Sequence, residues 1–262
     1  MNFAFMSFSC PELDIRSMVA TAKKYGYAGI EPRLDADHKH GIEVNATNSA
    51  LKEAAAIAAE QDIKICCLAT SCRFADPENY LEHQEHAGRV IELAAKIGVP
   101  AIRVFGGAIP DGVERSRSFD QIVRALGSLS DKAQEHGVAL CMETHDSWCD
   151  PEQVARVIKT VNHPAVAVNW DIMHPVLTAQ VAMDTAFETL KPYIRHVHVH
   201  DGVRHDGKLT LVPIGEGQVD HKSAVVLLRD CGYQGYISGE WINWEPYEVH
   251  LPREIARLKR YV

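Results

Sequence analysis

The feature that most constrains the fold is a repeated unit, in which a short β-rich apolar run is followed by a stretch of helical period, eight times along the chain. The candidate strands are Asn2–Phe8, Tyr27–Pro32, Ile63–Thr70, Ala101–Phe105, Val138–Glu143, Ala165–Asp171, Ile194–His200 and Gly235–Glu240. Alternating strands and helices imply a parallel sheet with right-handed crossovers. Eight such units predict an α/β fold, a closed (β/α)₈ barrel of the TIM-barrel type.

Helix signals lie between these runs. The clearest helical periods are those of Ala50–Glu60, Leu81–Ile97, Asp120–Glu135 and Ser223–Asp230. Several helical segments end in a glycine just before the next strand, at Gly26, Gly98, Gly137 and Gly232. No linker rich in Pro, Gly or Ser divides the chain, so we expect a single domain over residues 1–262.

An open, doubly wound sheet is the alternative architecture. That fold is expected to carry a glycine-rich phosphate turn after its first strand, whereas Phe8-Ser9-Cys10-Pro11 follows here. The barrel is therefore the favoured interpretation.

Composition narrows the function classes. The 262 residues include 27 basic and 35 acidic side chains, and the resulting net charge of −8 disfavours nucleic acid as a partner. No apolar run approaches the roughly 20 residues that a membrane helix needs, and Met1–Phe5 lacks the pattern of a secretion signal. Seven cysteines without Cys-x-x-Cys spacing indicate neither a disulfide framework nor a zinc knuckle. We expect a cytoplasmic protein that binds no membrane.

Strict alternation marks the run Arg195–Asp201, which places three imidazoles on one face of a strand and valines on the other. Imidazole is the commonest transition-metal ligand, and the ends of barrel strands carry the chemistry of such folds. The run is therefore interpreted as half of a metal site, with His198 as the ligand. His196 and His200 share its face, and we expect them to orient the ligands rather than to bind the metal directly.

Carboxylates end the neighbouring strands. Glu143, Asp171 and Glu240 stand at the expected ends of strands five, six and eight, and His198 lies near the end of strand seven. Three carboxylates in a confined mouth repel one another unless a cation compensates them. Oxygen ligands with a single nitrogen favour one divalent ion, Mn²⁺, Mg²⁺ or Co²⁺, with Zn²⁺ as an alternative. Open coordination positions would suit a substrate with two adjacent oxygens, such as a hydroxy-ketone sugar.

These strand ends resemble the xylose-isomerase-like TIM-barrel superfamily of sugar isomerases, epimerases and dehydratases, whose fold endonuclease IV shares. In its ketose 3-epimerase branch the resemblance puts the four metal ligands on Glu143, Asp171, His198 and Glu240. It also implies substrate contacts by His174 and Arg204. The segment Val212–Asp220 resembles the P-x-G-x-G-x-V-D/N loop of the family. Such barrels often form dimers or tetramers, so the resemblance implies a homo-oligomer.

The chain departs from the family pattern at two places. Epimerases carry a substrate-binding Glu six residues beyond the first ligand, whereas Cys149 stands here, with His145 nearby as a replacement contact. Endonuclease IV needs further histidine ligands at the ends of strands three and four, but those ends read Thr70-Ser71-Cys72 and Phe105-Gly106-Gly107. An endonuclease is therefore the less favoured function.

Further substrate contacts are candidates on composition and position alone. Glu31 ends strand two and Arg103 lies in strand four, where either could meet a hydroxyl or a phosphate. Trp241 could stack on the apolar face of a sugar. Arg204 lies in a long loop in which Asp206-Gly207 can turn a small hairpin.

The leading hypothesis is a metal-dependent isomerase or epimerase of a sugar, sugar phosphate or keto-polyol. Glu143 and Glu240 would act as general acid and base on opposite sides of the substrate, through an enediolate that the metal stabilises. A dehydratase of the inosose or dehydroshikimate type begins with the same proton abstraction, so it remains the main alternative. A barrel that binds a sugar derivative without turnover is a further one.

Overall fold

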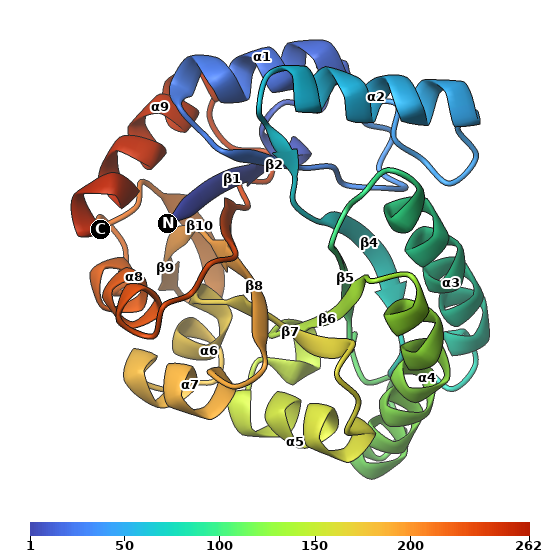
Figure 1. Ribbon diagram of the computed structural model, residues 1–262. Coiled ribbons are helices and arrows are strands. Elements are labelled where there is room, and N and C mark those ends of the chain that lie inside the picture. The colour runs from blue at the N-terminus through green and yellow to red at the C-terminus, as the bar shows by residue number, and fades with distance from the viewer.

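The computed structural model describes residues 1–262 as a barrel of parallel strands inside a ring of helices (Figure 1). The strands of the barrel are β1 (Asn2–Met6), β2 (Gly29–Glu31), β3 (Lys64–Ile65), β4 (Leu68–Arg73), β5 (Ala101–Phe105), β6 (Ala139–Glu143), β7 (Val166–Asp171), β8 (Ile194–Val199) and β11 (Tyr236–Gly239). Their order is β3-β2-β1-β11-β8-β7-β6-β5-β4, and all neighbours in it are parallel. The expected (β/α)₈ barrel is confirmed.

The barrel closes where β2 lies beside β3 and β4, which together occupy the place of the predicted third strand. The sequence pattern predicts one strand there, but Cys66 and Cys67 interrupt it and divide it into β3 and β4. Pairing continues across the interruption, because Cys66 N–H donates to the Ile30 carbonyl and Ala69 N–H to the Pro32 carbonyl. β3 and β4, the first and last strands of the sheet order, are thus two parts of one interrupted barrel strand, and the sheet closes into a barrel.

Helices connect successive strands and lie outside them (Figure 1). They are α1 (Ile15–Tyr25), α2 (Asn48–Glu60), α3 (Tyr80–Lys96), α4 (Arg115–Glu135), α5 (Pro151–Val161), α6 (Met173–Leu177), α7 (Met183–Leu190), α8 (His221–Asp230) and α9 (Tyr247–Leu258). Gly26 ends α1 in the left-handed region, at φ 79°, where a glycine is favoured. None of these helices has the length and apolar character needed to cross a bilayer.

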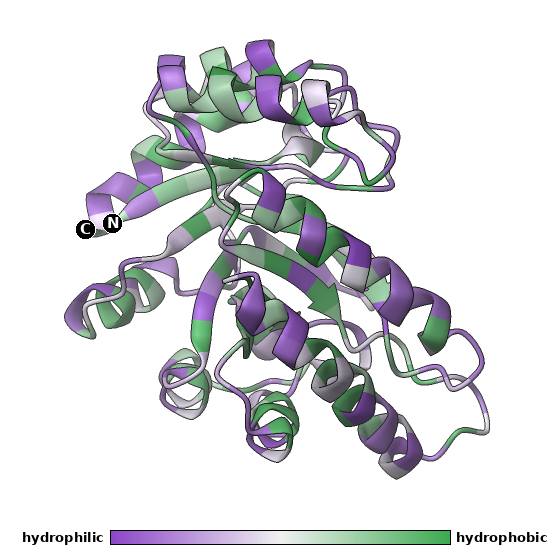
Figure 2. Cartoon of the chain, turned by 45° about the vertical axis from the view of Figure 1, so that its right-hand side comes forward, coloured by the Kyte–Doolittle hydropathy of each residue, from purple (hydrophilic) through white to green (hydrophobic).

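The apolar core lies between the barrel and the helices, each of which mixes hydrophobic and hydrophilic residues (Figure 2). A second, smaller cluster consists of Ala4, Cys66, Cys67, Ala101, Cys141 and Ala167. On β1, Phe3 and Phe5 pack in the core outside the barrel. Because successive side chains of a strand point to opposite faces, Ala4 points into the barrel. Small side chains therefore fill one part of the barrel interior and leave its other part to polar groups.

A two-stranded hairpin, β9 (Asp201–His205) and β10 (Lys208–Val212), follows β8 and confirms the predicted turn at Asp206-Gly207. Both turn residues have positive φ, 48° and 77°, as a two-residue hairpin loop requires.

The carboxylate of Asp201 fastens the loop that follows this hairpin. It accepts hydrogen bonds from the backbone N–H groups of Gly215 (2.8 Å), Gly217 (3.0 Å) and Val219 (3.3 Å). A Cβ atom at position 217 would lie 2.2 Å from Oδ1 of Asp201, so the loop needs a glycine there. The glycine pattern of this loop thus has a structural cause.

Candidate active site

Four side chains expected to form the site meet at neighbouring strand ends. Glu143 ends β6, Asp171 ends β7, His198 lies on β8 and Glu240 follows β11. One ligand atom from each lies within 4.8 Å of the others, and all four residues are buried. Since β11, β8, β7 and β6 are consecutive in the sheet, the barrel itself sets this spacing.

His198 lies at the centre of the cluster. Its Nδ1 is 2.7 Å from Oε1 of Glu143 and 3.4 Å from Oε2 of Glu240. Burial lowers the pKa of His198, but the carboxylates of Glu31, Glu143 and Glu240 outweigh that effect and raise this pKa well above its ordinary value. These carboxylates therefore favour a protonated ring in the absence of a cation, and its Nδ1 atom faces Glu143 and Glu240.

Arg103 provides a second positive charge to the same carboxylates. Its Nε lies 3.2 Å from Oε2 of Glu143, and its Nη2 lies 3.9 Å from Oε1 of Glu240. Nη1 donates to the Thr70 carbonyl, and the guanidinium lies over the Phe105 ring. Arg103 is 1% exposed and compensates the charges of the two glutamates, and the substrate contact expected of it stays a prediction.

The donor set fits a divalent cation. Several buried polar atoms of the cluster form ion-pair contacts but no aligned hydrogen bond: Oε2 of Glu143, Oδ2 of Asp171, Oε2 of Glu240 and Nε2 of His200. Buried carboxylates that lie this close repel one another, so a divalent cation among them would be stabilising. Carboxylate oxygens with one imidazole match the preferences of Mn²⁺, Mg²⁺ and Co²⁺.

Asp171 is oriented from two sides. Its Oδ1 accepts the backbone N–H groups of Met173 (2.8 Å) and His174 (3.1 Å), while Nε2 of His200 lies 2.8 Å from Oδ2. Burial raises the pKa of Asp171, but the His200 and His174 imidazoles outweigh it and keep that pKa far below its ordinary value. His200 thus lies against one of the candidate ligands, and Asp171, His174 and His200 also form a group whose ligand atoms lie within 4.8 Å of one another.

Histidines line the approach to the cluster. The ring of His174 is 4.3 Å from that of His145 and 5.6 Å from that of His200, between centroids. His174 and His145 are only partly buried, so both can reach a substrate at the mouth. Cys149, at the position where the resemblance leads one to expect a glutamate, is buried and donates its thiol to the Asp146 carbonyl.

The remaining expected contacts differ in their placement. Arg204 lies on the exposed hairpin and donates to the Thr178 hydroxyl at 3.1 Å, so its guanidinium is accessible. Trp241 is 1% exposed and packs against His250, and the stacking on a sugar expected of it stays a prediction. Glu31 is fully buried and contacts His196 and His198, which removes it from direct reach of solvent.

Asn169 is a site residue that the sequence analysis missed. Its side-chain amide lies 3.0 Å from Nδ1 of His198, and it is fully buried. The signal was the period of two on β7, because Asn169 precedes Asp171 by two residues and so shares its face.

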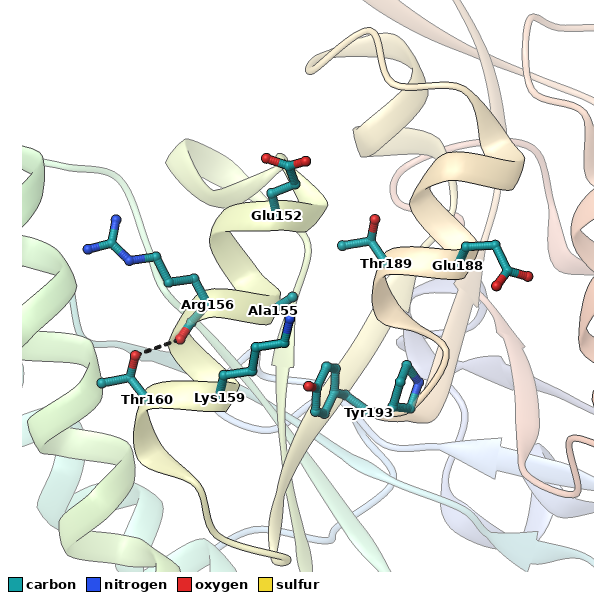
Figure 3. A pocket seen from close by; sticks show the side chains of 9 residues that line it. Glu152, Ala155, Arg156, Lys159, Thr160, Glu188, Thr189 and Tyr193 are labelled. Atoms are coloured by element: carbon teal, nitrogen blue, oxygen red, sulfur yellow. Dashed lines mark hydrogen bonds between the residues drawn. The ribbon is translucent and has the colours of Figure 1, made fainter.

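A groove of about 640 Å³ lies elsewhere, on the outside of the barrel between α5 and α7 (Figure 3). Its lining consists of Glu152, Ala155, Arg156, Lys159, Thr160, Glu188, Thr189, Pro192 and Tyr193. None of the expected site residues is among them, and most of these side chains are exposed. The candidate site is therefore placed at the barrel mouth, where the four candidate ligands meet.

The barrel and its cluster of carboxylates and imidazole place the chain among α/β barrels with a polar site at the strand ends. More narrowly, the chain belongs to the xylose isomerase-like TIM-barrel family, whose model matches residues 19–261. This confirms the resemblance drawn from the sequence.

Individual relatives are distant. The 2-oxo-tetronate isomerase of Pectobacterium atrosepticum is 20% identical over 176 residues, which are 63% of each chain. The chain spans only 53% to 63% of the length of the curated relatives that it matches. The chain thus covers less than two thirds of each.

Solved structures share the fold over nearly the whole chain. The probable 3-DHS dehydratase AsbF from Bacillus anthracis superimposes with a TM-score of 0.82 at 18% identity, over 99% of both chains. The 3-keto-D-glucoside 4-epimerase YcjR from E. coli gives 0.81 at 17% identity, again over 99% of both. At such identities the likeness establishes the fold alone.

Proposed function

We propose that this protein is a divalent-metal-dependent isomerase or epimerase of a small hydroxy-ketone sugar, sugar phosphate or keto-polyol. The observation that carries the proposal is the convergence of Glu143, Asp171, His198 and Glu240 at four neighbouring strand ends, with one ligand atom from each within 4.8 Å of the others. The names of the isomerase and epimerase relatives agree with it.

These four residues would hold the ion. When bound, a divalent cation polarises a carbonyl and makes the neighbouring C–H acidic. Asp171 would remain a fixed anionic ligand, because two backbone N–H groups hold one of its oxygens. The supporting contact of His200 keeps the other oxygen in place.

Proton transfer would fall to Glu143 and Glu240. Burial raises the pKa of Glu240, but His198 and Arg103 outweigh it and lower this pKa to about 2, so the carboxylate is ionised and can accept a proton at neutral pH. Glu143, whose Oε1 lies 2.7 Å from Nδ1 of His198, would act as the acid and donate a proton of its own, so it would have to be protonated while Glu240 is ionised. Glu240 would end the turnover protonated, and exchange with water would restore both groups. Return to the opposite face gives an epimer, and return to the neighbouring carbon gives an isomer.

A dehydratase is the second candidate, because one group at the mouth suits it. Burial lowers the pKa of His145, yet its hydrogen bond to Asp146 and the charge of Glu143 raise that pKa to about 9. An imidazolium at this place could donate a proton to a departing β-hydroxyl group. A dehydratase is also among the structures that share the fold.

The deciding experiment is a screen of ketoses, hydroxypyruvate, 2-oxo-tetronate, keto-inositols and dehydroshikimate with Mn²⁺, Mg²⁺, Co²⁺ or Zn²⁺ in deuterated water. Uptake of deuterium into the recovered sugar without loss of water supports an isomerase or epimerase. Loss of water from the substrate supports the dehydratase. Turnover that survives exhaustive chelation would contradict both.

A further inference from the structure

A buried carboxylate lies behind the candidate metal ligand. Glu31, at the end of β2, is 0% exposed and accepts from Nε2 of His196 (2.8 Å) with Oε2. The same carboxylate accepts from Nε2 of His198, at 3.1 Å from Oε1 and 3.2 Å from Oε2. One glutamate therefore holds two imidazoles of the alternating run.

The contact reaches across the inside of the barrel. Between β2 and β8 lie β1 and β11 in the sheet order, so Glu31 and His198 are not on adjacent strands. Residues that are paired across parallel strands point to the same side, and on the two intervening strands Ala4 pairs with Ser238, which in turn pairs with His198. Both of these inward positions therefore carry small side chains, and Glu31 itself pairs with Met6, two residues further along β1.

The acceptor fixes the orientation of His198. An ionised carboxylate can only accept hydrogen bonds, so the ring nitrogen that faces Glu31 must carry a proton. In a neutral ring with its proton on Nε2, the free lone pair is on Nδ1. That atom is the one that faces Glu143 and Glu240. A carboxylate that holds the far nitrogen of a metal-bound histidine is a general way to set its tautomer and raise its basicity.

The geometry points to Glu31 as a positioning residue that presents Nδ1 of His198 to the metal, with His196 as the second donor that fixes the carboxylate. This inference rests on the proposed function, because it assigns a role toward the ion. It moves Glu31 from the expected sugar contact to the support of a ligand.

The test compares Glu31→Gln with Glu254→Gln in the full-length protein. Glu254 is the matched control, since it is also 0% exposed but bonds to Ile214 N–H at 2.7 Å, away from the cluster. Titration calorimetry with Mn²⁺ and the visible absorption of the Co²⁺-loaded protein report on the metal. The unfolding temperature of the metal-free protein reports on folding.

We expect Glu31→Gln to weaken Mn²⁺ binding by about 10- to 100-fold and to shift the Co²⁺ bands. Glu254→Gln should leave both unchanged, even if it lowers the unfolding temperature. Wild-type affinity and an unchanged Co²⁺ spectrum in Glu31→Gln would overturn the inference while leaving the proposed function intact. A wild-type protein that binds none of the ions would overturn both.

A second measurement needs no variant and decides the matter if Glu31→Gln does not fold. Long-range ¹H–¹⁵N spectra of the Zn²⁺-loaded wild-type protein distinguish the two ring nitrogens of His198. The expected result is a proton on Nε2 and metal on Nδ1. Metal on Nε2, or a proton on Nδ1, would refute the role of Glu31.

Discussion

Nε of Arg103 lies 3.2 Å from Oε2 of Glu143, and both side chains are almost wholly buried. An ion pair in such a place is strongly coupled to its surroundings, because removing one partner leaves the other charge without compensation. The Arg103 guanidinium also lies 3.9 Å from Glu240, so one cation serves both proposed acid–base groups. In the proposed enzyme, Arg103 and the metal share the compensation of these carboxylates.

Replacing Arg103 should therefore harm the metal-free protein most. Arg103→Met is expected to lower its free energy of unfolding by about 3–5 kcal/mol, measured by urea denaturation. Added Mn²⁺ should restore part of that loss. The control is Arg204→Met on the exposed hairpin, for which a change within about 0.5 kcal/mol is expected. Equal losses in both variants would contradict this account of Arg103.

Proton transfer by the two glutamates predicts a specific defect. Glu143→Gln and Glu240→Gln should each lower kcat by about 10²- to 10⁴-fold and abolish solvent deuterium exchange into the substrate. The exposed Glu152→Gln on α5 serves as the control and should exchange at the wild-type rate. Undiminished exchange in either site variant would remove that glutamate from the mechanism.

Metal removal should lower stability through mass action. At a cation concentration of 100 times its Kd, the folded state gains about 2.7 kcal/mol, or about 5–10 °C in unfolding temperature. Differential scanning calorimetry with and without chelator measures the shift. Asp171→Asn weakens the cluster and should reduce it. If that variant shows the full shift, the ion binds elsewhere.

His40 predicts a loss of stability in mild acid. Its Nδ1 accepts the Ile42 N–H and its Nε2 donates to the Arg33 carbonyl, so the folded protein holds a neutral ring. Burial lowers the pKa of His40 from 6.5 to about 4. The unfolded chain thus takes up the proton first, and the stabilisation present above pH 6.5 disappears as the pH falls toward about 4.

The free energy of unfolding lost in this way is about 3 kcal/mol, because each unit of pKa difference between the folded and unfolded states corresponds to about 1.36 kcal/mol. Unfolding in urea between about pH 7 and about pH 4.5 measures it. His40→Gln removes the titrating ring, so its stability should fall less steeply with acid than that of the wild type. Parallel curves would mean that other groups cause the acid sensitivity.

Much of the fold could be predicted from local signals. Glycines such as Gly26 end helices because the left-handed region favours them, and Asp206-Gly207 marks the hairpin. The strand ends that hold Glu143 and Asp171 follow from the two-residue period of buried strands. These signals each depend on a few neighbouring residues.

The contacts of Glu31 and Arg103 could not be predicted in this way. Which interior side chains meet depends on how far each strand is displaced along the barrel axis, and no local pattern encodes that displacement. Glu31 meets His196 across 165 positions of sequence. The interruption of the predicted third strand at Cys66 could not be predicted either, since residues 63–70 have an ordinary strand pattern.

The candidate ligands all belong to β6, β7, β8 and β11, which form one continuous half of the ring. The connections after β2, β4 and β5 belong to the other half. Exchange of the loops beyond these strands would alter the shape of the entrance, provided that Glu31 on β2 and Arg103 on β5 stay in place behind the candidate ligands. New substrate preferences could then be selected in the loops after β2, β4 and β5 while the candidate ligands on the other half of the barrel stay unchanged.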